Sequence, residues 1–416
     1  MRNVRFLIEG QGPVPTLSGP PHEWVPSAGF RPLAQSIATR PDTTGAVGIS
    51  YLDARHPGRD MSAALHRAES FCSRFGLQAP ILLAPMAGAC PPALSIAVAK
   101  AGGLGACGAL LMQPDEILAW AAAVRAGANG AFQINTWIPD PAPARDPAHE
   151  ARVRDFLVRW GPEVPPEAAD AVPPAFDAQC RAILEAGPPI VSSIMGLYPA
   201  PFVATLKERG IAWFATVTTV AEARAAERAG ADAVVAQGSE AGGHRGSFVA
   251  GEAERQQVGL FALLPAVVDA VSIPVIAAGG IADARGVAAA LILGASAVQI
   301  GTGFLRCPEA GIHTAWADAL ALAAPEDTSV TRAFSGRAGR SLANGYVRAA
   351  AAADAPAPAP YPVQRALTAA MRSAAQKAGD VQRMQAWAGQ SARLASSEPA
   401  EQVVRRCWEG AKALLS

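Results

Sequence analysis

Eight short apolar runs alternate with alanine-rich helical stretches between residues 78 and 305, and glycine or proline separates one from the next. The runs are continuously apolar, which is typical of parallel strands covered on both faces. They occupy residues 80–86, 103–110, 131–137, 189–195, 212–218, 233–238, 274–280 and 297–303. Eight such units in tandem predict an α/β fold, a (β/α)8 TIM-like barrel. A doubly wound open sheet is the alternative, but no G-x-G-x-x-G turn follows the first run.

Three segments lie outside this alternation of apolar runs and helical stretches. Residues 1–66 are rich in proline and glycine and are expected to form an irregular N-terminal extension, with a helix beginning at Met61. An insertion at 138–176, containing one helix near 147–160, follows the third run. The predicted organisation is an extension (1–66), a barrel (67–305), an inserted helical subdomain that closes over the substrate (306–384) and C-terminal helices that return to the barrel (385–416).

Charge and cysteine usage exclude several classes of protein. The 35 basic residues balance the 35 acidic ones, so nothing favours nucleic acid or an anionic membrane as a partner. The six cysteines are scattered without metal-type spacing, so we expect reduced thiols and no metal site. No apolar stretch approaches the ~20 residues of a membrane span, and the N-terminus lacks signal-peptide architecture. We expect a soluble, cytoplasmic protein.

Functional residues of such barrels lie where the strands end. Glycine-rich turns follow the seventh and eighth runs, with Gly280 in "AAGGIAD" and with Gly301 and Thr302 in "QIGTGF". Because both turns open into helices, they predict a phosphate site built from backbone N–H groups. Asn135 and Gln237 end the third and sixth runs, where their amides suit the polar edge of a flat heterocycle. Bonding to loop backbone is the alternative for both amides.

The segment "QGSEAGGHRG", from Gln237 to Gly246, places four glycines around His244. Glycine lets main-chain atoms approach a ligand closely. An imidazole there can abstract a proton or hydrogen-bond a developing negative charge. Glu240 can orient the loop or remain solvated. A Schiff-base aldolase and a metal hydrolase are disfavoured, because no lysine and no His/Asp cluster lies at a strand end.

The motifs "APILLAPMAGA", "QIN", "AQGSEAGGHRG", "PVIAAGGIAD", "AVQIGTGFL", "TRAFSGRAGR" and "WAGQ" occur in this order, and together they resemble the nitronate monooxygenase family. The resemblance implies a non-covalent FMN in the barrel, with His244 as the catalytic residue and Tyr361 at the substrate pocket. Arg365 and Ala369 stand where a second aromatic and a lysine are usual. The implied FMN contacts are Met86, Asn135, Gln237, Gly242, Gly280, Gln299, Ile300, Gly301 and Thr302.

The reaction that the resemblance implies is oxidation of an alkyl nitronate, such as propionate 3-nitronate, with O2 to a carbonyl compound and nitrite. His244 would either remove the α-proton of a neutral nitroalkane or hold an anionic nitronate as a hydrogen-bond donor or cation, and "WAGQ" favours the second role. The alternatives are an FMN-dependent enoyl-thioester reductase, an NAD(P)H:quinone reductase and a flavin-binding module without turnover. The expected partners are a small-molecule nitronate and O2, and a homodimer is left open.

Overall fold

The computed structural model describes residues 61–128 and 130–416, all of which belong to one compact unit of the chain, Ala54–Ser416. Most of the predicted N-terminal extension therefore lies outside the described residues. The helix expected from Met61 is confirmed as α1 (Met61–Phe75). Within the described ranges no helix is long and apolar enough to cross a membrane.

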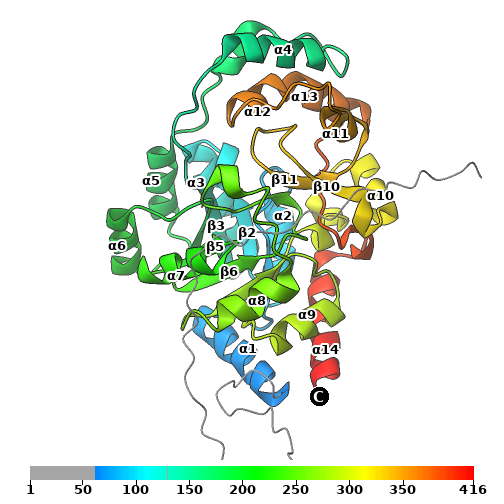
Figure 1. Cartoon of the computed structure of the whole chain (residues 1–416). Helices are drawn as coiled ribbons and strands as arrows, with labels where there is room; N and C mark the ends of the chain where they lie inside the picture. The colour runs from blue at the N-terminus through cyan, green and yellow to red at the C-terminus, as the bar shows by residue number, and fades with distance from the viewer. Residues whose placement is uncertain (1–60, 129) are drawn as a thin grey trace, which may run out of the picture. The chain divides into compact units, whose positions relative to one another are not determined.

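Eight parallel strands form a barrel and confirm the predicted fold (Figure 1). The order is β1-β9-β8-β6-β5-β4-β3-β2. The barrel closes between its first two strands, where the Leu83 N–H donates to the carbonyl of Leu104 at 2.8 Å. The strands are β1 (Ile81–Leu83), β2 (Gly105–Gly108), β3 (Phe132–Trp137), β4 (Ile190–Ile194), β5 (Ala212–Val217), β6 (Ala233–Gln237), β8 (Val275–Ala278) and β9 (Ala297–Ile300). Each lies inside one of the eight apolar runs.

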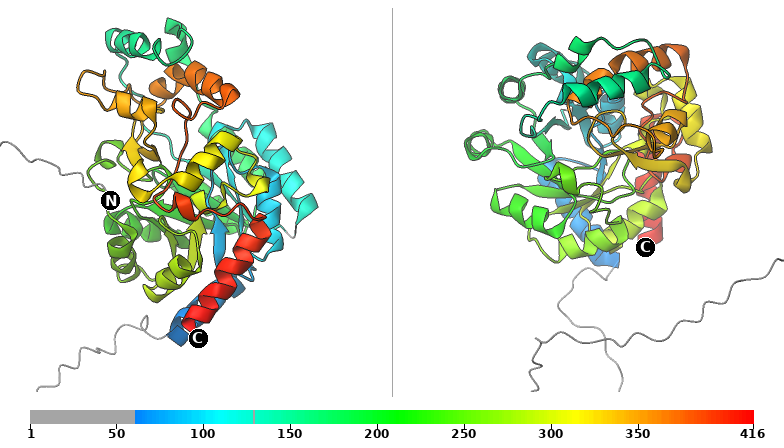
Figure 2. Two further views of the ribbon diagram at one scale, coloured as in Figure 1. Left: turned by 90° about the vertical axis from the view of Figure 1, so that its right-hand side faces the viewer. Right: turned by 45° about the horizontal axis from the view of Figure 1, so that its top comes forward.

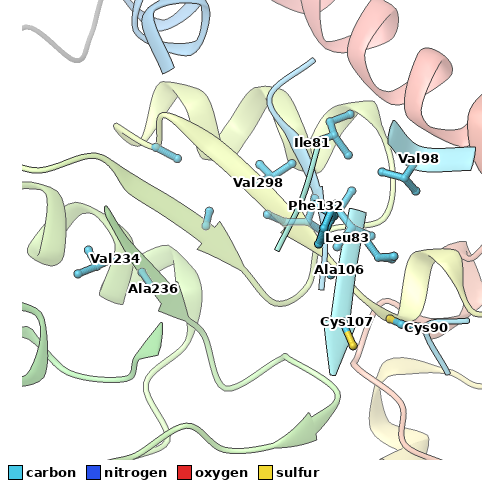
Figure 3. Close-up of a cluster of buried hydrophobic side chains, with 14 of the residues drawn as sticks. Ile81, Leu83, Cys90, Val98, Ala106, Cys107, Phe132, Val234, Ala236 and Val298 are labelled. Carbon is cyan, nitrogen blue, oxygen red and sulfur yellow. The ribbon is translucent and has the colours of Figure 1, made fainter. Parts of the chain in front are cut away.

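Strand side chains alternate between two apolar layers, which explains why the runs are continuously apolar. Inward-facing residues such as Phe214 and Ile276 fill the barrel together with Phe71 and Phe75 of α1, so α1 closes one end of the barrel. Outward-facing residues such as Leu83, Phe132 and Val298 pack under the surrounding helices (Figure 3). The remaining helices of the barrel layer are α2 (Pro92–Lys100), α3 (Pro114–Gly127), α5 (Phe176–Ala186), α6 (Ala200–Glu208), α7 (Val220–Arg228), α8 (Leu260–Val268), α9 (Ala284–Ile292) and α14 (Ala400–Leu415).

A second apolar core lies beyond the barrel and joins two segments far apart in sequence. The predicted helix near 147–160 is present as α4 (Pro147–Leu157). Phe156 and Leu157 of this helix pack with Phe334, Tyr346 and Met371, and α4 lies beside α12 and α13 in every view (Figures 1 and 2). We call residues 147–170 and 328–387 the cap. Its other helices are α11 (Gly345–Ala350), α12 (Val363–Leu367) and α13 (Ala369–Ala378), and α10 (Thr314–Leu322) precedes it.

The segment 306–384, expected to be helical, also contains two strands, β10 (Thr328–Thr331) and β11 (Gly339–Leu342). They form a three-stranded antiparallel sheet in which β11 pairs with β7 (Gly243–His244), from the loop after β6. Pairing with a distant loop supplies hydrogen-bond partners for the backbone N–H and C=O groups of these short segments. Their sequences have no strong strand pattern of their own. The glycine-rich loop is thereby tied to the cap.

Candidate active site

A cavity of about 370 Å³ lies at the carboxyl ends of the barrel strands, a volume that suits a small molecule. Most of the predicted site residues line it together, namely Met86, Asn135, Gln237, Gly242, His244, Gly280, Gln299, Gly301 and Thr302. The side chains of Ile300 and Tyr361 do not line it. Ile300 points into the layer under the helices, and the ring of Tyr361 lies 5.2 Å from that of Trp137, which does line the cavity.

The glycines of the loop after β6 have two different functions. A Cβ on Gly242 would lie 2.5 Å from the backbone nitrogen of Gly389, so this glycine lets the loop pack directly against the "WAGQ" segment. Gly389 in turn donates its N–H to Thr302 Oγ1 at 2.9 Å. Gly243 has a φ of +77° and nothing within 4 Å of the position of a Cβ, so there the backbone is open to the cavity.

The two predicted amides differ in what they bind. Gln237 holds the loop, because its Nε2 donates to the carbonyl of His244 at 3.0 Å and its Oε1 accepts from the N–H of Gly246 at 2.8 Å. This is the loop-backbone alternative. Asn135 donates to Ser192 Oγ at 3.0 Å, and its Oδ1 accepts no hydrogen bond from any described residue.

Gln299 offers the complementary group to the cavity. Its Oε1 accepts from the buried amide of Gln133 at 3.3 Å, while its Nε2 has no acceptor among the described residues. The free acceptor of Asn135 and the free donor of Gln299 therefore line the same cavity. An acceptor and a donor that line one cavity can bind the polar edge of a flat heteroaromatic ring.

At the expected phosphate site the glycine backbone lines the cavity, but the start of the following helix, α9, is capped by a side chain. Gly279 and Gly280 line the cavity with φ values of +110° and +71°. However, the first N–H groups of α9 are occupied, because Asp283 caps this helix through the N–H groups of Arg285 and Gly286. A phosphate there would meet glycine backbone and not the end of α9. Glu240, which also lines the cavity, accepts from the N–H of Leu260 at the start of α8 and so orders the loop.

His244 lies in β7, paired with Gly339, and its imidazole is enclosed by tryptophans. The ring centroids of Trp137 and Trp387 lie 4.6 and 4.7 Å from that of His244, in edge-to-face geometry. Burial, reinforced by the positive charges of Arg337 and Arg365, lowers the pKa of His244 to about 3. The imidazole is therefore neutral at physiological pH.

A hydrogen bond to Ser335 selects the tautomer of His244. Nε2 lies 2.7 Å from Ser335 Oγ, and the same hydroxyl donates to the carbonyl of Arg337 at 3.1 Å while accepting from its N–H at 3.3 Å. The hydroxyl has one proton and two lone pairs. All three contacts are satisfied only when the His244 Nε2–H donates to Ser335, which leaves Nδ1 with a free lone pair.

Several residues that line the cavity or contact His244 were not identified from sequence. Trp137 is the last residue of β3, so the strand-end rule was sufficient to find it. Trp387 belongs to "WAGQ", and Arg365 had been noted only as a departure from the usual aromatic. Ser335 lies in "TRAFSGRAGR", 91 residues from His244, and Arg372 belongs to α13. No local pattern marks these last two positions.

The sequence of the chain is similar to those of known proteins. The family model described as nitronate monooxygenase matches residues 69–410. A nitronate monooxygenase of Paraburkholderia phytofirmans is 41% identical over 335 residues, which cover 79% of this chain and 91% of that protein. A probable nitronate monooxygenase of Staphylococcus aureus is 37% identical over 331 residues, covering 79% of this chain and 93% of that protein.

Solved structures resemble the chain in the same way. A nitroalkane oxidase from Streptomyces ansochromogenes is 36% identical with a TM-score of 0.75, covering 83% of this chain and 99% of that one. FabK from Thermotoga maritima is 30% identical with a TM-score of 0.66, covering 83% of this chain and 96% of that one.

Proposed function

The chain belongs to the nitronate monooxygenase family, and from this premise we propose that it oxidises alkyl nitronates, such as propionate 3-nitronate, with O2 to a carbonyl compound and nitrite. One observation carries the proposal beyond family membership. A neutral imidazole, His244, lies between two tryptophans and lines the same cavity as the free amide groups of Asn135 and Gln299. This is the arrangement needed to hold a small polar substrate against a flat cofactor.

We infer that the cofactor is FMN. The free Oδ1 of Asn135 and the free Nε2 of Gln299 fit the acceptor and donor edges of an isoalloxazine ring. The open backbone at Gly243 and the glycine turns at Gly280 and Gly301 allow a ring or a phosphate to approach closely. When bound, FMN supplies the acceptor for the electrons removed from the substrate. Met86, Gly242 and Thr302 line the same cavity.

We infer that His244 acts from its neutral state in either of its two candidate roles. With a neutral nitroalkane, the lone pair on Nδ1 can accept the α-proton while Nε2–H remains bonded to Ser335. With a nitronate, which is already an anion, the ring would have to donate from Nδ1, and the Ser335 hydroxyl would turn to donate to Nε2. The lowered pKa does not support a cationic ring in the ligand-free protein.

The proposal is tested by an anaerobic absorbance titration of the purified protein loaded with FMN. Propionate 3-nitronate is added to one cuvette and NADPH to another. We expect the nitronate alone to reduce the flavin, with nitrite released when O2 is admitted. Reduction by NADPH alone would instead support a reductase. A protein that takes up no FMN would contradict both assignments.

The role of His244 is tested separately with the His244→Ala variant on a nitroalkane and on its nitronate. Loss of turnover with both substrates would support a part in binding the anion. Loss confined to the nitroalkane would assign His244 as the base, a function typically worth ~10²–10⁴-fold. Unchanged turnover of both would remove His244 from the reaction.

A further inference from the structure

A fully buried glutamine, Gln133 of β3, links three strands across the barrel interior. It lies two residues before Asn135, on the same face of the strand, but unlike Asn135 it does not line the cavity. Its Nε2 donates to the carbonyl of Leu83 in β1 and to Oε1 of Gln299 in β9, each at 3.3 Å. Because β1 and β2 stand between β3 and β9 in the barrel, this contact joins strands that are not neighbours.

These two contacts determine which end of the Gln299 amide is left for the cavity. The oxygen and nitrogen of a side-chain amide have nearly the same shape, so their hydrogen-bond partners decide the orientation. The Leu83 carbonyl can only accept, so the Gln133 atom that faces it is the nitrogen. The same nitrogen faces Gln299, which must therefore offer its oxygen. A backbone carbonyl thus forces Gln299 to keep its Nε2, a donor, for the cavity that it lines.

The other end of the Gln133 amide is left without a partner. Its Oε1 is buried and accepts no hydrogen bond from any residue in the described ranges. A buried acceptor without a donor costs free energy, which an apolar side chain of similar length, such as methionine, would avoid. Packing alone therefore does not account for an amide at this position, whereas the two hydrogen bonds from Nε2 do.

Resting on the proposed FMN cofactor, we propose that Gln133 is a positioning residue that sets the redox potential of the flavin, by holding Gln299 as a donor toward an acceptor atom of the ring. Hydrogen bonds to the ring tune the electronic properties of a flavin. Reduction adds electron density to the nitrogen and oxygen atoms of the ring, so a donor stabilises the reduced form more than the oxidised form. Gln133 thereby raises the potential and favours electron transfer from the substrate, although it does not line the cavity itself.

The test measures the midpoint potential of the FMN-loaded protein by anaerobic equilibration with a reference dye, and the dissociation constant of oxidised FMN by flavin fluorescence. Gln133→Met should weaken the binding of reduced relative to oxidised FMN by about 10-fold, which lowers the potential by about 30 mV for a two-electron couple. Affinity for oxidised FMN should change by less than about 3-fold. The matched control is Gln179→Met, because Gln179 is also buried and donates to backbone carbonyls but does not line the cavity.

A double variant shows whether Gln133 acts through Gln299. In a Gln299→Met background, Gln133→Met should shift the potential no further, since the donor that it positions is already absent. Additive shifts, an equal shift in Gln179→Met, or an unchanged potential in Gln133→Met would each overturn the proposal.

A second variant covers the case in which Gln133→Met does not fold. Gln133→Glu keeps the shape of the side chain, but its carboxyl has at most one hydrogen for two acceptors. Gln299 is then no longer forced to present its donor, so the potential should again fall, and an unchanged value would contradict the proposal. Wild-type protein that takes up no FMN would overturn the cofactor assignment itself, which is a different result from a loaded protein whose potential does not respond.

Discussion

Replacing His244 with glutamine is expected to remove a defined part of the pH dependence of folding stability. In the folded chain His244 is half-buried beside Trp137 and Trp387, and loss of solvent together with two nearby arginine charges lowers its pKa to about 3. In the unfolded chain a histidine titrates near its ordinary value of about 6.5. Glutamine can keep a hydrogen bond to Ser335 but takes up no proton.

The sign follows from the protons bound in each state. Below pH ~6.5 the unfolded imidazole takes up a proton and the folded one does not, so the free energy of unfolding falls as the pH is lowered. The slope is about 1.4 kcal/mol per pH unit, and it persists until the pH approaches the folded pKa. Between pH 7 and pH 5 the wild-type chain should therefore lose about 2 kcal/mol more stability than His244→Gln.

Urea unfolding of both proteins, free of cofactor, at these two pH values measures the quantity directly. Subtracting the variant from the wild type cancels every titrating group that the two proteins share. A difference below about 0.5 kcal/mol would refute the reasoning, because it would mean that His244 titrates almost normally in the folded chain. Histidine NMR provides an independent check, since the His244 signals should not shift between pH 7 and pH 5.

Three further predictions concern other parts of the site. Ser335→Ala should lower kcat for a neutral nitroalkane by about 10-fold, because the His244 ring loses its orienting acceptor, while FMN affinity stays unchanged in a fluorescence titration. Gly242→Ala should weaken FMN binding, since its Cβ would force the loop away from the "WAGQ" segment; Gly251→Ala, with open space around its Cβ, is the control. Arg337→Ala should destabilise the fold by about 3 kcal/mol in urea unfolding, because it breaks a largely buried ion pair. It should also raise the pKa of His244 by NMR, because a neighbouring positive charge is lost; an unmoved pKa would contradict the electrostatic account.

The barrel was predictable because burial on both faces dictates each strand locally. The runs that contain Phe214 and Val298 carry apolar residues on both faces of the strand for that reason, and predicting them required no knowledge of the partner strands. The strand-end rule likewise gave Asn135 and Gln237 their places. What Gln237 does there was not predictable, because its amide bonds to a loop whose path depends on tertiary packing.

The cap was less accessible to sequence reasoning. β10 and β11 are short, and β11 is a strand because it pairs with the loop that carries His244. The contact between His244 and Ser335 joins positions 91 residues apart. The start of α9 was also difficult to predict, because the capping side chain of Asp283 decides whether its N–H groups are available to a ligand. Such features arise from pairing and competition between groups, which composition and periodicity do not record.

The shared core of the cap has a consequence for how this enzyme could be re-engineered. Phe156 and Leu157 belong to the insertion after β3, whereas Phe334, Tyr346 and Met371 belong to residues 328–387. Grafting either piece alone onto a related barrel would leave its apolar face without the residues that normally pack against it. An exposed apolar face favours aggregation. New substrate ranges should therefore be transplanted by exchanging both pieces as a matched pair.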